Sequence, residues 1–161
     1  KMKIEQLKQN YYKNVKDLLV ELQEYIVEID NFQLNILSSD YKEKYFDYML
    51  KDCETNQGQI YVAVDDGKVV GMIAGFVQSY SDRDNLDYVC PKKGIVAELI
   101  VSKTARSAGI GTMLLSEMEN YFKSINCKYS QIDVFAPNET AKMFYYKKGY
   151  QDRMITLLKK L

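Results

Sequence analysis

The sequence GIVAELIVSKTARSAGIGT, residues 94–112, decides the fold. Its first eight residues are almost entirely apolar, which is typical of a central strand covered on both faces. Gly109 and Gly111 then precede apolar residues with helical spacing, which continue to Ile125. The stretch therefore predicts a buried strand that leads through a glycine-containing turn into an amphipathic helix.

The residues before this unit predict helices followed by a hairpin. The expected elements are a short strand over residues 2–7, helices over 11–29 and from Ser39 or Asp40 to about Gly58, and strands over 59–64 and 68–77. The last two strands are separated by Asp66-Gly67, a pair that favours a tight type I′ turn because this turn needs positive φ. Gly71 and Gly75 indicate a bulge or a close backbone approach.

The residues after the unit predict three further elements. Residues 129–135 read as a strand, and Asn138 begins a helix that Gly149 stops. Residues 150–161 are expected to form one or two strands, and residues 78–93 a long polar connection. This order of elements indicates a mixed sheet with helices on both faces.

The composition excludes several kinds of chemistry. The 161 residues suffice for one domain with its own core, and 22 basic residues balance 22 acidic ones. Binding to nucleic acid or an anionic membrane usually requires a basic excess, so neither partner is expected. The absence of histidine removes imidazole bases and histidine-containing zinc sites. Three distant cysteines without a CxxC pair argue against a metal site and fit a cytoplasmic location.

The glycine turn has the features of an anion site. The first N–H groups of a helix lack partners and carry the positive end of its dipole, so they bind phosphates. Gly109 and Gly111 let the backbone approach such a group, and Arg106 adds a fixed charge. A Walker A loop fails because no lysine precedes Thr112, and a Rossmann fingerprint fails because Leu114 replaces its third glycine. The spacing leaves open whether the glycines bind phosphate or only turn the chain.

Two motifs resemble those of the GNAT superfamily of N-acetyltransferases. The first is Arg106-x-x-Gly109-x-Gly111 after the apolar strand, which is similar to the family's acetyl-coenzyme A motif. The second, NETAKMFYYKKGY at residues 138–150, is similar to the family's Asn-x-x-Ala-x-x-aromatic-Tyr-x-x-x-Gly-aromatic signature. The resemblance implies one α/β (α+β) domain of three layers over residues 1–161. Its mixed, mostly antiparallel sheet is expected to have six to seven strands flanked by about four helices.

The resemblance also implies direct transfer of an acetyl group from acetyl-coenzyme A to a primary amine in a ternary complex. Backbone N–H groups after Arg106 would bind the pyrophosphate, and the end of the 94–101 strand would pair with the pantetheine amides once this strand and the next splay apart. A backbone N–H near Ile100 would polarise the thioester carbonyl. The expected cofactor-binding residues are Leu99, Ile100, Val101, Arg106, Ser107, Ala108, Gly109, Ile110, Gly111, Thr112 and Asn138.

Tyr145 and Glu98 are the expected catalytic residues. Tyr145 matches the signature's tyrosine and shares a helix face with Asn138, so it would protonate the leaving thiolate; otherwise it packs a core. Glu98 is the only ionisable residue in an apolar strand, where a carboxylate is costly unless used or paired. It either serves the amine as base or holds the ammonium, or else it forms a structural ion pair. Asn138 is also a good helix cap, which is an alternative to a cofactor role.

The acceptor, a small-molecule or protein amine, is not defined by any motif. Tyr80 and Tyr88 beside the acidic connection are candidate acceptor residues, and Asp82, Asp84 and Asp87 there either favour a cation or are simply solvated. Edge strands near the C-terminus favour a homodimer. Two competing functions remain, a non-catalytic coenzyme A-binding or regulatory module of the same fold and a protein that binds another nucleotide at the same loop.

Overall fold

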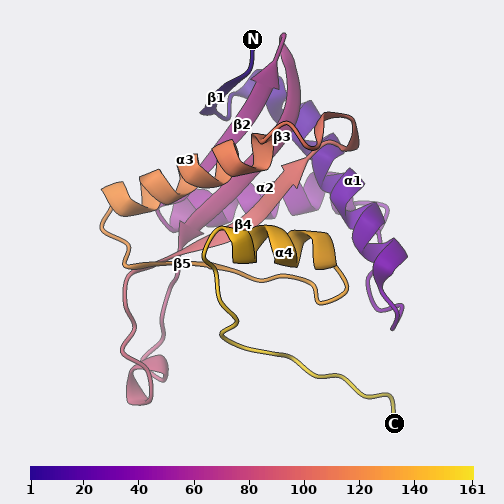
Figure 1. The fold of residues 1–161 in the computed structure, drawn as a ribbon. Helices are drawn as coiled ribbons and strands as arrows, with labels where there is room; N and C mark the ends of the chain where they lie inside the picture. Colours follow the sequence, from indigo (N-terminus) through magenta and orange to yellow (C-terminus); the bar gives the residue numbers. More distant parts are fainter.

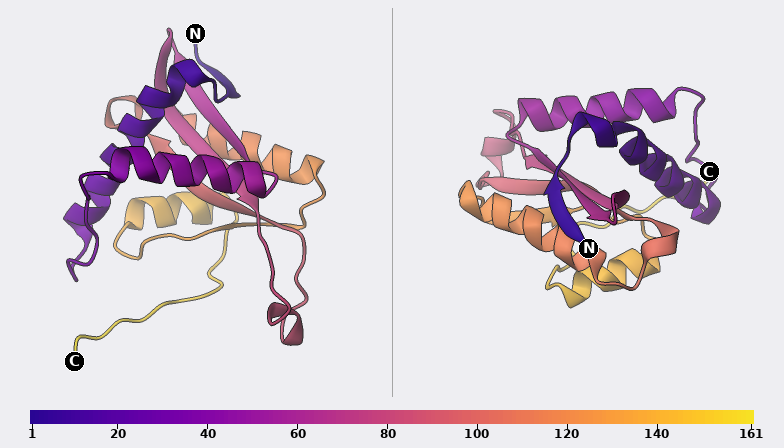
Figure 2. Two further views of the ribbon diagram at one scale, coloured as in Figure 1. Left: turned by 180° about the vertical axis from the view of Figure 1, so that it is seen from behind. Right: turned by 90° about the horizontal axis from the view of Figure 1, so that it is seen from above.

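The computed structural model describes all residues, 1–161, and has one sheet between two layers of helices (Figures 1 and 2). The elements are β1 (Lys3–Gln6), α1 (Tyr12–Ile29), α2 (Tyr41–Thr55), β2 (Gln59–Asp65), β3 (Lys68–Val77), β4 (Lys93–Val101), α3 (Ile110–Ser124), β5 (Tyr129–Ile132) and α4 (Glu139–Lys147). Short 3-10 turns lie at residues 9–11, 84–86 and 103–105. None of the helices combines the length and the apolar composition needed to cross a membrane.

The strands lie in the order in which they occur in the chain. β1, β2, β3 and β4 are successively antiparallel, and β5 pairs with β4 in parallel. Viewed from above, α1 and α2 cover one face of the sheet, and α3 and α4 the other (Figure 2, right). The expectation of a three-layer fold with a mixed, mostly antiparallel sheet and four helices is confirmed, whereas the expected six to seven strands are wrong, because the sheet has five.

Each face of the sheet has its own apolar core. Under α1 and α2, Val15, Leu19 and Phe46 pack against the sheet and are at most 1% exposed. Under α3, Leu114 and Met118 are completely buried. Glycines in the strands allow this close packing, since a Cβ on Gly75 would lie 2.8 Å from the Met118 sulfur. Of the two alternatives expected at Gly75, the close approach is present, and the bulge in this pairing lies on the facing strand β4.

The hairpin between β2 and β3 follows the sequence prediction. Asp66 and Gly67 both have positive φ, 46° and 79°, as a type I′ turn requires. The first strand, both helices and both hairpin strands lie where the periodicity places them, to within a few residues. Long, strongly patterned segments are those in which local sequence specifies the element most clearly.

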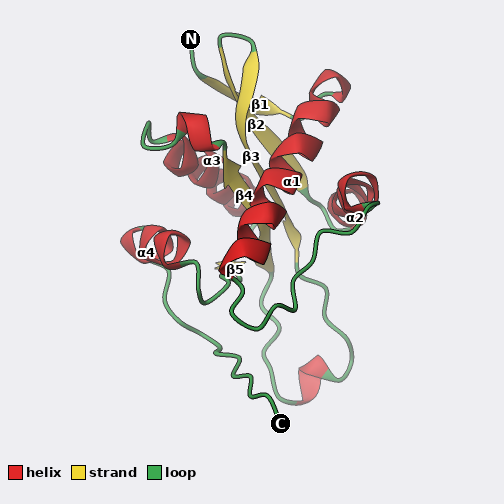
Figure 3. Cartoon of the chain, turned by 90° about the vertical axis from the view of Figure 1, so that its right-hand side faces the viewer, coloured by secondary structure: helices red, strands yellow, loops and turns green.

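The residues after α4 form no strand, which contradicts the strands expected over 150–161. Tyr150 is the last residue that is not exposed, and its hydroxyl donates to Glu119 (3.0 Å) and accepts from Ser130 (2.8 Å). Beyond it every residue is exposed, and the chain leaves the body of the protein (Figure 3). Strand propensity is local, but a strand also needs a neighbouring edge to pair its backbone, and this segment has none.

Candidate functional site

The site is centred on the place where β4 and β5 separate. The two strands pair from Lys93–Tyr129 to Val96–Ile132 and no further, although β4 continues to Val101 (Figure 1). Leu99, Ile100 and Val101 therefore pair with β3 on one side and with no strand on the other. The splay expected from the family resemblance is present, and it leaves a strand edge open toward β5.

The N-terminus of α3 lies directly after this open edge. Gly109 is its N-cap with φ 73°, a left-handed conformation that glycine adopts without strain, and no side chain caps the helix. The first N–H groups, at Ile110, Gly111 and Thr112, consequently remain available to a ligand. Ser107 also has positive φ (71°), so the loop turns sharply twice in three residues.

The loop leaves free space where a ligand would approach. A Cβ on Gly109 would meet no atom within 4 Å, and one on Gly111 would make only ordinary contacts, the nearest with Phe144 at 3.5 Å. The protein's own packing therefore does not require glycine at Gly111. The Nε of Arg106 donates to the Val101 carbonyl at 3.4 Å, and Lys103 N–H donates to Glu21 at 2.8 Å. These two contacts fix the loop against β4 and α1.

A cavity of about 270 Å³ opens beside the separated strands. It is lined by α1, the α1–α2 connection, α2, β4, the segment from β5 onward and α4, so residues distant in sequence meet there. Of the sequence-predicted residues, Glu98, Leu99, Asn138 and Tyr145 line it. The cavity therefore joins both expected catalytic residues to the open edge of β4.

Glu98 reaches the cavity because β4 carries a one-residue bulge. Ala74 and Gly75 of β3 pair with Glu98 and Val96, so Ala97 is the extra residue. Val96 is buried in the α3 core, and a regular strand would point Glu98 to the same face. The bulge instead turns Glu98 to the α1–α2 face, where its carboxylate accepts a hydrogen bond from the Tyr45 hydroxyl.

The surroundings of Glu98 make it a better base than an exposed carboxylate. Burial raises the pKa of Glu98, while the hydrogen bond from Tyr45 lowers it, and burial has the larger effect. Burial, with the charge of Glu98, also raises the pKa of Tyr41 and of Tyr45. The two tyrosine hydroxyls therefore keep their protons at neutral pH, and Tyr45 acts only as a donor to the carboxylate.

Tyr145 enters the cavity from α4, on the opposite side. Its ring is 6% exposed and packs edge-on against Phe144 (5.1 Å between ring centroids) and Tyr150 (5.6 Å). Burial raises the pKa of Tyr145, with smaller contributions from Tyr150 and Glu98, and no hydrogen bond contributes. Since no fully buried polar side-chain atom lacks a partner, this hydroxyl is accessible from the cavity. Packing fixes the ring and leaves its proton available.

Asn138 caps α4, as its alternative role predicted. Its Oδ1 accepts from Ala141 N–H at 3.3 Å, and Asn138 also lines the cavity. The helix ends at Lys147, and Gly149 follows its cap with a φ of 88°, which only glycine adopts without strain. The motif over residues 138–150 therefore builds a short capped helix that presents Tyr145.

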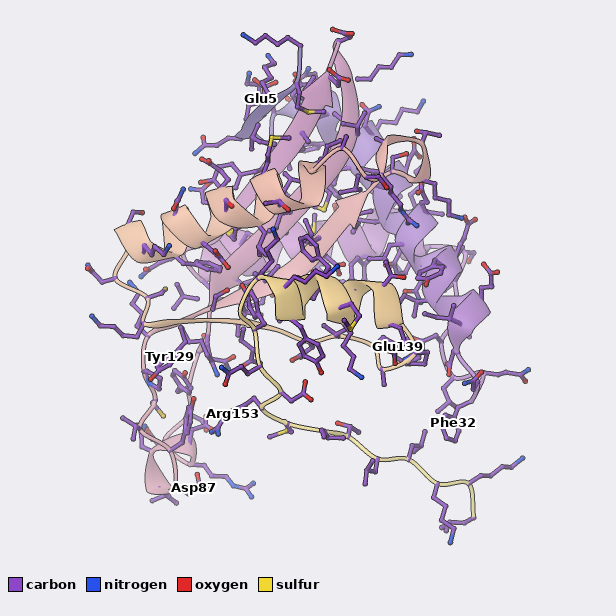
Figure 4. The ribbon with its side chains drawn as sticks, viewed as in Figure 1. Glu5, Phe32, Asp87, Tyr129, Glu139 and Arg153 are labelled. Carbon is purple, nitrogen blue, oxygen red and sulfur yellow. The ribbon has the colours of Figure 1, made fainter.

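The 78–92 connection does not contribute to the cavity. Tyr80 and Tyr88 lie beside each other (5.9 Å between centroids), with Lys93 over both rings, and neither lines the cavity. Asp87 lies at the far end of this connection (Figure 4), and Asp84 caps the local turn at Ser81. Tyr80 and Tyr88 therefore lie apart from the cavity that Glu98 and Tyr145 share, and their role as acceptor residues stays a prediction.

Comparison with known proteins identifies the family. The family model described as "Acetyltransferase (GNAT) family" matches residues 24–150, which is most of the chain. The chain belongs to the GNAT acetyltransferase family. The resemblance carried by the two sequence motifs is thereby confirmed. In this GNAT member, the second motif lines the cavity through Asn138, Ala141 and Tyr145, whereas the first motif lies outside the lining, with Gly111 facing Phe144 of α4.

A curated relative and two solved structures agree with this assignment. An uncharacterised N-acetyltransferase of Methanocaldococcus jannaschii is 41% identical over 96 residues, which are 59% of this chain and 54% of the relative, so the chain spans about half of that protein's length. The BH1408 protein of Bacillus halodurans has a TM-score of 0.83 and 20% identity, with 99% of each chain covered. The aminoglycoside N-acetyltransferase AAC(6')-Iy, solved with CoA, has a TM-score of 0.72 and 13% identity, covering 100% of this chain and 95% of its own. At these identities the structures show the common fold alone.

Sequence reasoning missed most of the lining residues of the GNAT cavity, including the two tyrosines beside Glu98. Tyr41 and Tyr45 share a face of α2 and stack at 4.7 Å, and both line the cavity. Their spacing of four residues is the same for a packing face and for a cavity wall. Only the bulge in β4, which brings Glu98 to Tyr45, distinguishes the two.

Proposed function

We propose that this GNAT member transfers an acetyl group from acetyl-coenzyme A directly to a primary amine within a ternary complex. The observation that carries the proposal is the single cavity in which the open end of β4 meets Glu98 from one side and Tyr145 from the other. The uncapped start of α3 follows directly on the same strand. The strand edge that would bind the cofactor therefore lies between the helix start that would bind its phosphates and the two side chains that would handle protons.

The fit to acetyl-coenzyme A rests on this chain's backbone. N–H groups from Ser107 to Thr112 would hold the diphosphate, with Arg106 adding its charge. The free space at Gly109 and Gly111 supports close approach of such a group. The open edge of residues 99–101 would pair with the pantetheine amides as an added strand does. When bound, acetyl-coenzyme A supplies the activated acyl thioester.

The chain's own groups then meet three chemical needs. A backbone N–H near Ile100 would donate to the carbonyl oxygen as negative charge develops on it. Glu98 would receive the proton that the amine nitrogen loses as the C–N bond forms. The raised pKa of Glu98 supports this role, since a stronger base accepts the proton more readily.

Tyr145 would act on the sulfur as the C–S bond breaks. An ordinary thiol has a pKa of about 8.5, and burial raises the pKa of Tyr145 above its ordinary value of 10.0. Its hydroxyl is therefore a weaker acid than the departing thiol, and its main contribution is a hydrogen bond to the thiolate. The free thiol forms when the thiolate takes up the proton released by the amine, which balances the reaction.

A thiol-release assay with a panel of primary amines tests the proposal. We expect free coenzyme A to form only when acetyl-coenzyme A and a suitable amine are both present, with the acetylamine as the second product. Thermal shifts with acetyl-coenzyme A, ATP and NAD provide the binding control. Stabilisation by ATP or NAD alone would refute the proposal, and so would binding of acetyl-coenzyme A with no amine acetylated by any member of the panel.

A further inference from the structure

The charge of the cavity limits what acceptor it takes. Eleven of its sixteen lining residues are hydrophobic, and the only charged ones are the acids Glu98 and Asp133. We propose, building on the acetyltransferase function above, that the acceptor is a primary amine carried on an apolar body, with no anionic group beside the nitrogen.

The absence of a basic lining residue disfavours amines that carry a carboxylate or a phosphate. An anionic group beside the amine would face two acids and no lysine or arginine, and it would lose its hydration without a partner. Amino acids and phosphorylated amino sugars both carry such a group. Polycations fit poorly for the opposite reason, because every further ammonium would be desolvated against an apolar wall.

Stacked aromatic rings provide a surface for the apolar body. Tyr41 and Tyr45 lie 4.7 Å apart at 18° between ring planes, and Leu22 and Ile26 of α1 line the same cavity. Tyr45 is already tied to Glu98 through its hydroxyl. A cation held at Glu98 therefore lies next to tyrosine rings, which also attract cations through their π faces.

The apolar character continues outward along the α1–α2 connection. Phe32, Leu34 and Ile36 are 50%, 68% and 68% exposed there, and Figure 4 shows Phe32 projecting outward from this connection. The connection is held in place despite these exposed side chains. The buried Asp30 carboxylate accepts from the N–H groups of Phe32, Leu34 and Asn35 at 2.8–3.0 Å, and Gln23 donates to the Ile36 carbonyl at 2.7 Å.

The hydrogen bonds to Asp30 hold the α1–α2 connection in one conformation. Its backbone hydrogen bonds lower the pKa of Asp30 to about 2, so the carboxylate stays charged and keeps its partners at every physiological pH. Asn35, from the same connection, lines the cavity. A fixed apolar rim thus extends the apolar wall, and an amine with a hydrocarbon or aromatic body contacts both.

Paired amines test the proposal directly. Phenethylamine and phenylalanine differ only by the carboxylate beside the amine, while spermidine and glucosamine 6-phosphate represent polycations and phosphorylated sugars. We expect kcat/KM for phenethylamine to exceed that for each of the others at least about tenfold, a difference of about 1.4 kcal/mol in transition-state binding. Equal or higher kcat/KM for phenylalanine, spermidine or glucosamine 6-phosphate would overturn the acceptor class while leaving acetyl transfer established. No turnover of any amine would overturn both.

Two variants test the charge of the cavity and its apolar wall separately. Gln23→Arg places a cation at the cavity and keeps a donor for the Ile36 carbonyl, so the phenylalanine-to-phenethylamine ratio of kcat/KM should rise about tenfold. Tyr41→Ala should raise the KM for phenethylamine and leave the affinity for acetyl-coenzyme A unchanged. The matched control is Tyr129→Ala, since Tyr129 is 63% exposed on β5 and does not line the cavity. An unchanged ratio in Gln23→Arg would count against the charge argument even if Tyr41→Ala fails to fold.

Discussion

A tyrosine lies on each side of the cavity, and the two differ in whether the hydroxyl makes a hydrogen bond. Tyr145 on α4 is packed by aromatic neighbours and its hydroxyl makes no hydrogen bond, whereas the Tyr45 hydroxyl on α2 is bound to Glu98. Burial raises the pKa of both. The difference teaches that one hydroxyl is available to a ligand, while the other is committed to holding a carboxylate. A departing group would be served from α4 and an entering amine from the α2 side.

Removing the available hydroxyl should have the largest effect. In Tyr145→Phe the ring and its packing remain, but the developing thiolate loses its donor, so kcat should fall about 10²–10³-fold. The affinity for acetyl-coenzyme A, measured by calorimetry, should hardly change. The control is Tyr146→Phe, because Tyr146 binds Asp152 outside the cavity. Full turnover in Tyr145→Phe would leave this tyrosine a packing residue.

Replacing Glu98, the carboxylate that Tyr45 binds, should alter the pH dependence of kcat/KM. Glu98 must be ionised to accept a proton, and its raised pKa places the acidic limb of kcat/KM above the ordinary glutamate value of 4.5. Glu98→Gln keeps an acceptor for Tyr45 but removes this limb, and the rate should fall about 10²-fold on its plateau. A limb that persists unchanged in the variant would assign it to another group.

The raised pKa of Glu98 also makes the stability of the folded protein depend on pH. Because the pKa of Glu98 is higher in the folded protein, the folded state holds this proton more tightly than the unfolded state. Stability is therefore lost as pH rises from about 4.5 through the folded-state pKa. The free energy of unfolding of Glu98→Gln, relative to the wild type, should increase over that range in urea titrations.

Reversing the charge beside the α3 N-terminus should act on binding rather than on turnover. In Arg106→Glu the affinity for acetyl-coenzyme A should fall about 10–100-fold, since a charged hydrogen bond of about 1.5–3 kcal/mol is lost. Arg83→Glu makes the same charge change on the exposed 78–92 connection and serves as the control. Equal affinities in the two variants would remove Arg106 from the proposed phosphate site.

The smallest effect is expected at the start of α4. Asn138→Ala removes the cap to Ala141 and should lower the free energy of unfolding by about 0.5–2 kcal/mol. Thr140→Ala, on the same turn but exposed and not the cap, should cost less. If Asn138→Ala also weakens binding of acetyl-coenzyme A, Asn138 contacts the cofactor in addition to capping the helix.

The local sequence was sufficient to predict the side of the site that is formed by the two contiguous motifs. The apolar strand, the Gly109 turn and the capped helix carrying Tyr145 each depend on hydrogen bonds and backbone angles within a few residues, so their pattern specified them. The β2–β3 hairpin was predicted for the same reason. Local preference misled at residues 150–161, where no sheet edge was present to pair the chain, and at residues 133–135, because β5 ends at Ile132 instead of continuing to residue 135.

Tertiary structure alone decided the acceptor side. The bulge at Ala97 has no signature in the sequence, yet it turns Glu98 from the α3 core to Tyr45. The tyrosine pair on α2 and the connection fixed by Asp30 become a cavity wall only when α1 and α2 pack on the sheet. Periodicity shows which residues share a face, whereas what that face meets depends on register and packing between segments distant in the chain.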